Sequence, residues 1–235
     1  MGGDSSAVRS RLREGVVQVC WNKFAFAAIK ANGSVVTWGA AMMGGDSSAV
    51  AALLADGVVQ VCGNDDAFAA IKANGSVVTW GWGNVSCGNH GGNSSAVRSR
   101  LTDGVVQVCG NNRAFAAIKA NGSVVTWGDA MMGGDSSAVR SRLREGVVQV
   151  CGNNNAFAAI KANGSVVTWG DAMMGGDSSE VAALLTEGVV QVCGNDDAFA
   201  AIKANGSVVT WGDAMHGGDS SEVAALLTDG VVQLC

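Results

Sequence analysis

Three short apolar runs recur in a fixed order along the chain. Within residues 44–81 they are Val-Val-Gln-Val-Cys, Ala-Phe-Ala-Ala-Ile and Val-Val-Thr-Trp. β-Branched and aromatic residues favour strands, and each run has the length of an ordinary strand. The pair Asn74-Gly75 between the second and third runs is typical of a two-residue type I′ turn. The pattern therefore predicts a three-stranded meander whose last two strands form a hairpin.

The two-residue turn also predicts the register of this hairpin. It places Ile71 opposite Val78 and Ala69 opposite Trp80, so these four residues share one face. The other face is apolar except for one lysine. We therefore expect both faces to be at least partly covered, as they are when sheets stack on sheets.

A helical segment is predicted between successive meanders. The sequence from Asp177 to Glu180 matches a capping box, and Val181, Leu184 and Leu185 follow on one apolar stripe. Gly188 stands where a helix commonly ends in the left-handed conformation. We expect a helix of about ten residues, or ~15 Å, which returns the chain to the start of the next meander.

The whole pattern repeats. Gly-Gly pairs that precede Asp-Ser-Ser or Asn-Ser-Ser recur every 42 residues, with one step of 47. The helix-strand segment occurs six times and the hairpin five times. We predict a single repeat domain over residues 1–235, made of five and a half repeats with an insertion near residues 82–90. The Gly-Gly pairs begin at Gly2, Gly44, Gly91, Gly133, Gly175 and Gly217.

The hairpin sequence AFAAIKANGSVVTWG resembles the repeat of the regulator of chromosome condensation family, in which a hairpin ends in Val-x-x-Trp-Gly. The resemblance implies a mainly β repeat protein, a β-propeller-like array of three-stranded meanders each followed by a short helix. An open β/α solenoid is the alternative, because six helix-strand segments could cap both ends of five stacked hairpins. The tryptophans expected to be structural are Trp38, Trp80, Trp127, Trp169 and Trp211.

Composition narrows the range of partners. The formal net charge is −5 and the isoelectric point is near 4.9, which argues against nucleic acid because such domains show a basic face. No window approaches 18 consecutive apolar residues, and no charged-then-apolar leader opens the sequence. We expect no membrane span and an intracellular protein.

The five-residue insertion is the one departure from the repeat that gathers distinctive side chains. We predict a partner-binding loop there, with Trp82, Asn84, Cys87 and His90 as its candidate residues. The alternative is slippage during repeat duplication, which leaves a longer surface loop. One cysteine and one histidine supply two ligands where structural zinc wants four. We therefore expect no metal site, no cofactor and no catalytic residue.

Two residue types recur once in each repeat. The cysteines at the end of the first strand are expected to be a row of reduced, partly buried thiols. The lysines of the second strand could form a charged ladder for an acidic partner, or a solvated row offset by loop aspartates. The cysteines are Cys20, Cys62, Cys109, Cys151, Cys193 and Cys235, and the lysines are Lys30, Lys72, Lys119, Lys161 and Lys203.

These observations lead to three functional hypotheses. The first is a non-enzymatic protein-protein interaction or scaffold module, since the sequence has no Ser/His/Asp set and no phosphate-binding loop. The second, implied by the family resemblance, is a guanine-nucleotide exchange factor for a small GTPase. The third is a structural accessory subunit of a large assembly. All three involve a protein partner.

Overall fold

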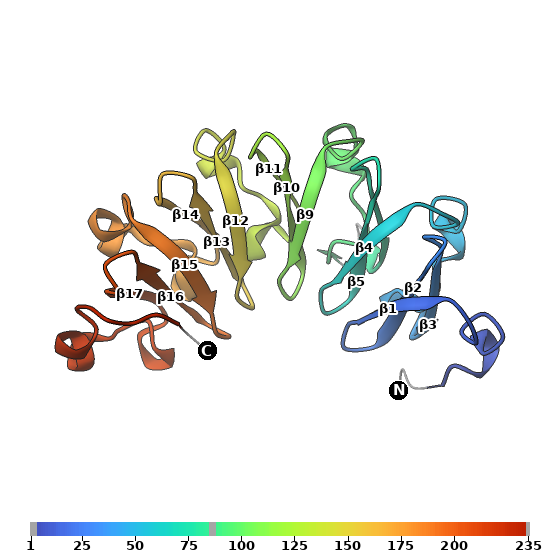
Figure 1. Cartoon of the computed structure of the whole chain (residues 1–235), viewed down its shortest axis with the longest axis horizontal. Helices are drawn as coiled ribbons and strands as arrows, with labels where there is room; N and C mark the ends of the chain where they lie inside the picture. Colours follow the sequence, from blue (N-terminus) through green and yellow to red (C-terminus); the bar gives the residue numbers. More distant parts are fainter. Residues whose placement is uncertain (1–3, 85–87, 234–235) are drawn as a thin grey trace. The chain divides into compact units, whose positions relative to one another are not determined.

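Five three-stranded antiparallel sheets make up most of the chain. The computed structural model describes residues 4–84 and 88–233 (Figure 1). In each sheet the middle strand pairs with the two beside it in sequence, so the predicted meander is confirmed. The sheets are β1 (Val16–Trp21), β2 (Ala25–Lys30) and β3 (Val35–Gly39); β4 (Val58–Gly63), β5 (Ala67–Lys72) and β6 (Val77–Gly81); β9 (Val105–Gly110), β10 (Ala114–Lys119) and β11 (Val124–Gly128); β12 (Val147–Gly152), β13 (Ala156–Lys161) and β14 (Val166–Gly170); and β15 (Val189–Gly194), β16 (Ala198–Lys203) and β17 (Val208–Gly212).

Short helical turns follow every sheet, as predicted. None of the helices in the described residues is long and apolar enough to cross a membrane. The 3-10 helices are η1 (Ser6–Val8), η2 (Ala41–Met43), η3 (Ser48–Val50), η4 (Ser95–Arg100), η6 (Ser137–Val139), η8 (Ser179–Leu185), η9 (Ala214–His216) and η10 (Ser221–Leu226), and the π-helical turns are η5 (Ala130–Gly134) and η7 (Ala172–Gly176).

The prediction of a ten-residue helix with a capping box is wrong. Helix η8 has seven residues of 3-10 type, and its N-cap is Ser178, which makes no side-chain capping bond. The carboxylate of Asp177 instead accepts a hydrogen bond from the Ser179 N–H at 2.8 Å, inside the loop. The Ser178 hydroxyl pairs with Thr168 Oγ1 at 3.0 Å. Because the polar groups before the helix hold the loop to the preceding sheet, they are not free to cap an α-helix.

The chain divides into two compact units. The first comprises residues 1–120 and 125–129, and the second residues 121–124 and 130–235. The first unit thus holds the sheets β1–β3 and β4–β6 together with most of β9–β11, and the second holds β12–β14 and β15–β17. A single repeat domain over residues 1–235 stays a prediction.

The predicted hairpin register is wrong by one residue. Ile71 pairs with Val77, and Phe68 pairs with Trp80. A shift of one residue moves every side chain of one strand to the opposite face. Phe68 and Trp80 therefore share a face and stack, with ring centroids 5.3 Å apart.

The turn explains the shift. No residue other than glycine has a positive φ in the described part of the chain, so Asn74 cannot take the type I′ conformation. The Lys72 N–H donates to Ser76 O at 2.9 Å, and the Gly75 N–H donates to Lys72 O at 2.7 Å. The loop therefore has three residues and ends in Gly75, whose φ is +75°. Asn74 Oδ1 accepts from the Ser76 N–H at 3.0 Å, which fixes the asparagine in the turn.

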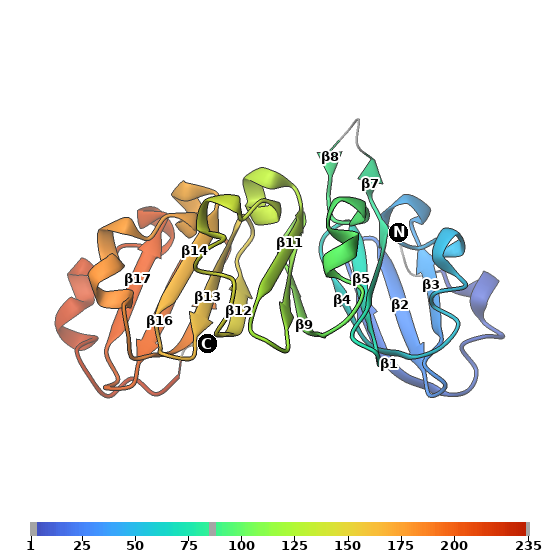
Figure 2. The same cartoon turned by 90° about the horizontal axis from the view of Figure 1, so that it is seen from above.

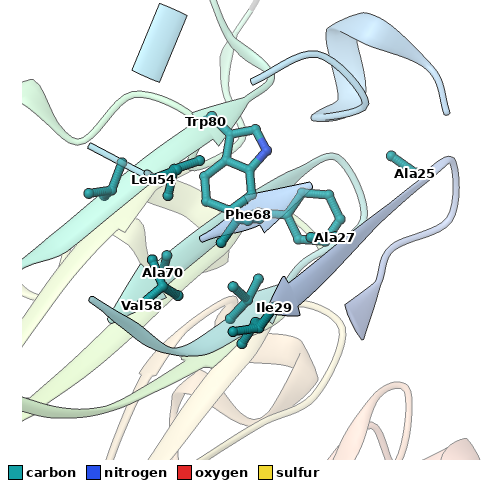
Figure 3. Close-up of a cluster of buried hydrophobic side chains, with 11 residues drawn as sticks. Ala25, Ala27, Ile29, Leu54, Val58, Phe68, Ala70 and Trp80 are labelled. Atoms are coloured by element: carbon teal, nitrogen blue, oxygen red, sulfur yellow. The ribbon is translucent and has the colours of Figure 1, made fainter. Parts of the chain in front are cut away.

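Neighbouring sheets of one unit pack face to face, as expected. In Figure 3 the rings of Phe68 and Trp80 lie on the small side chains Ala25 and Ala27 of the sheet β1–β3, and Leu54 closes the cluster. Phe68 is fully buried, and burying such a side chain contributes roughly 1.5–3 kcal/mol. The same cluster recurs between β4–β6 and β9–β11 in the first unit, and between β12–β14 and β15–β17 in the second.

Backbone hydrogen bonds join the third strand and the hairpin turn of a sheet to the segment that follows them. The Val35 N–H donates to Leu54 O at 2.9 Å, and the Val58 N–H donates to Gly33 O at 2.9 Å. Gly33 has a φ of +75°, and a Cβ there would lie 2.5 Å from Gly57 N. The hairpin turn must therefore be glycine both for its conformation and for the close approach of the next segment.

Two substitutions in the second unit separate these two requirements. Gly164 and Gly188 have φ values of +75° and +76°. A Cβ at Gly164 would lie 2.5 Å from Gly188 N, whereas one at Gly188 would meet only Lys203 Cε at 3.5 Å. We expect Gly188→Ala to cost about 1–2 kcal/mol of unfolding free energy and Gly164→Ala about 2–5 kcal/mol. Urea unfolding measures both, and equal losses would contradict the close approach.

Candidate functional site

The insertion forms a small antiparallel hairpin. Strands β7 (Gly83–Asn84) and β8 (Gly88–Asn89) pair with each other, and Figure 2 shows them projecting beyond the neighbouring strands of the first unit. Asn84, one of the predicted residues, lies in β7 opposite Gly88. Cys87 lies outside the described residues. In the four other repeats the same connection is a short helical turn.

Trp82 and His90 stand at the base of this hairpin and contact each other. Their ring centroids are 5.8 Å apart. His90 Nδ1 lies 2.8 Å from Asp66 Oδ2, and both side chains are only 13% exposed. Because a carboxylate only accepts hydrogen bonds, Nδ1 carries the ring proton and donates a hydrogen bond to Asp66. The structure thus brings together two of the predicted residues and adds Asp66, which the sequence analysis missed.

An asparagine of the same turn holds the connection in place. Asn64 Oδ1 accepts hydrogen bonds from the Asp66 and Ala67 N–H groups, and its Nδ2 donates to His90 O at 2.6 Å. Trp82 Nε1 is buried and finds no hydrogen-bond partner among the described residues. A buried donor left unpaired is uncommon in proteins. The base of the hairpin is therefore a fixed platform with one unsatisfied indole N–H.

The histidine and the aspartate occur together in the repeats: a repeat has both residues or neither. His216 occupies the position of His90 in the last repeat, and Asp197 occupies that of Asp66; the two lie 3.6 Å apart, with the histidine 58% exposed. The three other repeats have neither residue: their methionines Met43, Met132 and Met174 follow turns that carry Phe24, Arg113 and Asn155 at the aspartate position. This pairing within one chain was the signal that could have identified Asp66 from the sequence.

Exposed methionines mark the same connection in the other repeats. Their exposed fractions range from 63% for Met42 to 91% for Met215. Methionine is flexible and polarizable, which suits it to contact surfaces that adapt to a partner. In the second repeat, the hairpin stands where the other repeats have this exposed methionine. The four methionines are Met42, Met131, Met173 and Met215.

A groove of about 680 Å³ lies in the second unit, between η8 and η10. Asp177, Glu180 and Asp219 line it together with Trp211, and no lysine, arginine or histidine does. Its charge is therefore negative. No group of three or more metal-ligating His, Cys, Asp or Glu side chains occurs in the described residues.

The five described cysteines are partly exposed and form no disulfide with one another. Cys20 Sγ donates a hydrogen bond to Val61 O in the next sheet at 3.2 Å. Burial raises the pKa of Cys62 to about 11. Because the thiolate is the reactive form, Cys62 is an inert thiol at neutral pH.

The lysines of the second strand have structural contacts. Lys72 Nζ donates to Leu53 O at 2.9 Å and lies 3.4 Å from Asp56. Lys119 contacts Asp103 at 3.2 Å, and Lys203 donates to Leu184 O at 2.9 Å. Lys72 and Lys119 thus contact aspartates of the preceding segment, and Lys72 and Lys203 donate to its backbone carbonyls.

Trp80, Trp127 and Trp211 belong to the buried clusters between neighbouring sheets of one unit. The tryptophans of all five hairpins make the same ring contact within their own sheet. Each stacks on the phenylalanine opposite it, with centroids 5.2–5.4 Å apart. Trp80 Nε1 donates to Gly44 O at 3.0 Å, and Trp127, Trp169 and Trp211 make the equivalent bond to Gly91, Gly133 and Gly175.

The chain matches no protein-family model and no curated protein. Solved structures of propeller proteins do match it, at the level of the fold. Prp20p from Saccharomyces cerevisiae, also described as yeast RCC1, gives a TM-score of 0.57 at 18% identity over 86% of this chain and 58% of that chain. Human WBSCR16 gives 0.53 at 17% identity over 93% of this chain and 67% of that chain. The ectodomain of the Arabidopsis thaliana receptor kinase ACR4 gives 0.51 at 13% identity over 93% and 66%.

These likenesses establish the class of protein. The chain is a tandem-repeat protein with a propeller-like fold similar to that of RCC1, and the resemblance seen in the hairpin sequence is confirmed. It spans less than two thirds of the length of Prp20p. The Prp20p structure was described with the binding of that protein to Gsp1p and histones, and a second structure of the yeast protein was solved with Kap60.

The buried His-Asp contact can be tested by a double-mutant cycle. We expect Asp66→Asn and His90→Met to be coupled by about 1–2 kcal/mol of unfolding free energy, because each single change leaves a partly buried polar group without its partner. Urea unfolding near pH 6 measures the cycle. Asp197 and His216 are the matched control, because this histidine is 58% exposed and also lies 3.4 Å from Asp213; the expected coupling is below about 0.5 kcal/mol. Equal coupling in both cycles would contradict a special role for burial.

Proposed function

We propose that this protein is a non-enzymatic protein-protein interaction or scaffold module and that the hairpin insertion is its distinctive contact surface. The observation that carries the proposal is the fixed platform at the base of β7 and β8. There the rings of Trp82 and His90 contact each other at a tilt of 31°, and Asn64 and Asp66 hold the connection. The asparagine bond recurs in repeats without the insertion, so the part of the platform that is particular to the hairpin is Trp82 against the buried His90.

The other repeats support the same surface. Their connections place an exposed methionine where the second repeat places the hairpin. Repeat proteins commonly use equivalent positions of successive repeats to build one extended contact area. Within the first unit, a partner that contacts the connection of the first repeat at Met42 would be positioned by the hairpin of the second. Trp82, Asn84, Cys87 and His90 remain the proposed residues of this contact.

The charge of the chain bears on the kind of partner. The net charge of −5 and the acidic groove of the second unit favour a protein with a basic or neutral surface over nucleic acid. That the chain does not bind nucleic acid is part of the proposal.

A loop exchange tests the proposal. Residues 82–90 are replaced by Asp-Ala-Met-Met, the sequence of residues 129–132, so that the second repeat acquires the ordinary connection. We expect the fold to persist and the proteins that co-purify with the native chain to be lost, as identified by quantitative mass spectrometry. His216→Met, which changes the equivalent residue of the last repeat, is the control and should retain them. Unchanged partners after the exchange would refute the proposed contact surface.

Two assays distinguish the proposed function from the two other candidate functions. An exchange factor for a small GTPase is suggested by the fold shared with Prp20p, whose structure was described with binding to Gsp1p. Accelerated release of labelled nucleotide from a panel of small GTPases would favour it. An accessory subunit of a large assembly would instead co-purify in a fixed ratio with a stable complex.

A further inference from the structure

One turn position distinguishes the first repeat from all the others. The residue that follows the cysteine of the first strand is glycine in four repeats and Trp21 in the first. The four glycines are Gly63, Gly110, Gly152 and Gly194.

Packing between sheets explains the glycine. A Cβ at Gly63 would lie 2.7 Å from the carbonyl oxygen of Trp21 in the preceding sheet, and one at Gly110 would lie 3.0 Å from that of Gly63. Each turn of the first unit therefore presses on the same point of the sheet before it. The Cβ position is fixed by the backbone, so no choice of side-chain rotamer relieves such a contact.

Trp21 lies on the outer face of the sheet β1–β3. Among the described residues, no sheet packs on this face as β1–β3 packs on β4–β6. Its side chain is 69% exposed, and Phe24 in the same turn is 39% exposed. Val19 is 43% exposed, whereas its equivalents Val61 and Val108 are each 4% exposed. The outer face of the sheet β1–β3 is thus the same apolar face that the next two sheets bury, with an indole added at its contact point.

We infer that Trp21 closes this face to any further repeat of the same kind. A sheet placed here in the geometry that relates β4–β6 to β1–β3 would set its carbonyl oxygen against the Trp21 Cβ and would leave no room for the indole. The face cannot accept another repeat of the array or the end of a second copy in this geometry. Trp21 therefore determines which partners the face excludes, independently of what binds at the hairpin insertion.

An extended chain tests the inference. A copy of residues 132–173 is added in phase before Met1, so that the junction reproduces the sequence around Met173 and Met174. With Trp21 present, we expect the strand amides of the added repeat to exchange hydrogen at least about tenfold faster than those of β2, the middle strand of the end sheet in the unextended chain. In the same extended chain with Trp21→Gly, we expect protection close to that of β2 in the unextended chain. Phe24→Asn is the matched control and should not restore protection.

Either of two results overturns the inference. The first is equal protection of the added repeat with and without Trp21, whether it is high or low in both. The second comes from the unextended chain, where Gly63→Trp is the reciprocal change. We expect it to lower the urea midpoint clearly while Trp21→Gly leaves the midpoint nearly unchanged. If Gly63→Trp were tolerated as well as Trp21→Gly, a tryptophan would not block the contact between sheets.

Discussion

The close approach of neighbouring sheets is the constraint on which the structure of each unit depends. The aromatic pair of one sheet, such as Phe68 and Trp80, packs on the alanines of the sheet before it. That contact requires small residues on one side and large rings on the other, since interiors are close-packed. It also requires glycine where the backbones meet: a Cβ at Gly33 or Gly75 would lie 2.5 Å from the next segment.

A sheet in this arrangement cannot bury both its faces alone. The sheet β4–β6 contributes Phe68 and Ala70 to the cluster with β1–β3, and Ala69 and Ile71 to the cluster with β9–β11. Stability is therefore shared between neighbours, as in other repeat proteins. By the inference drawn above, Trp21 would not be tolerated at a position where another sheet packs as β1–β3 packs on β4–β6.

The connection after the third strand is the part of the repeat that differs in length. Four repeats fill it with a helical turn and an exposed methionine, and the second repeat fills it with the hairpin β7 and β8. The contacts of Asn64 and Asp66 with His90 show that the insertion is integrated into the repeat at its base. A binding surface can therefore change there without disturbing the contacts between sheets, which is why loops commonly carry function.

The sequence by itself determined the repeat, the three strands and their order, because β-branched runs, Asn-Gly turns and a fixed period are local signals. It also located the insertion and the structural role of the tryptophans. The register of the hairpin was decided by the backbone: Asn74 keeps a negative φ, the loop has three residues, and Phe68 rather than Ala69 meets Trp80. The helices became short 3-10 turns because Ser178 and Asp177 bond to the neighbouring sheet and loop. The contact of Asp66 with His90 joins residues 24 positions apart, so only the tertiary structure could bring them together.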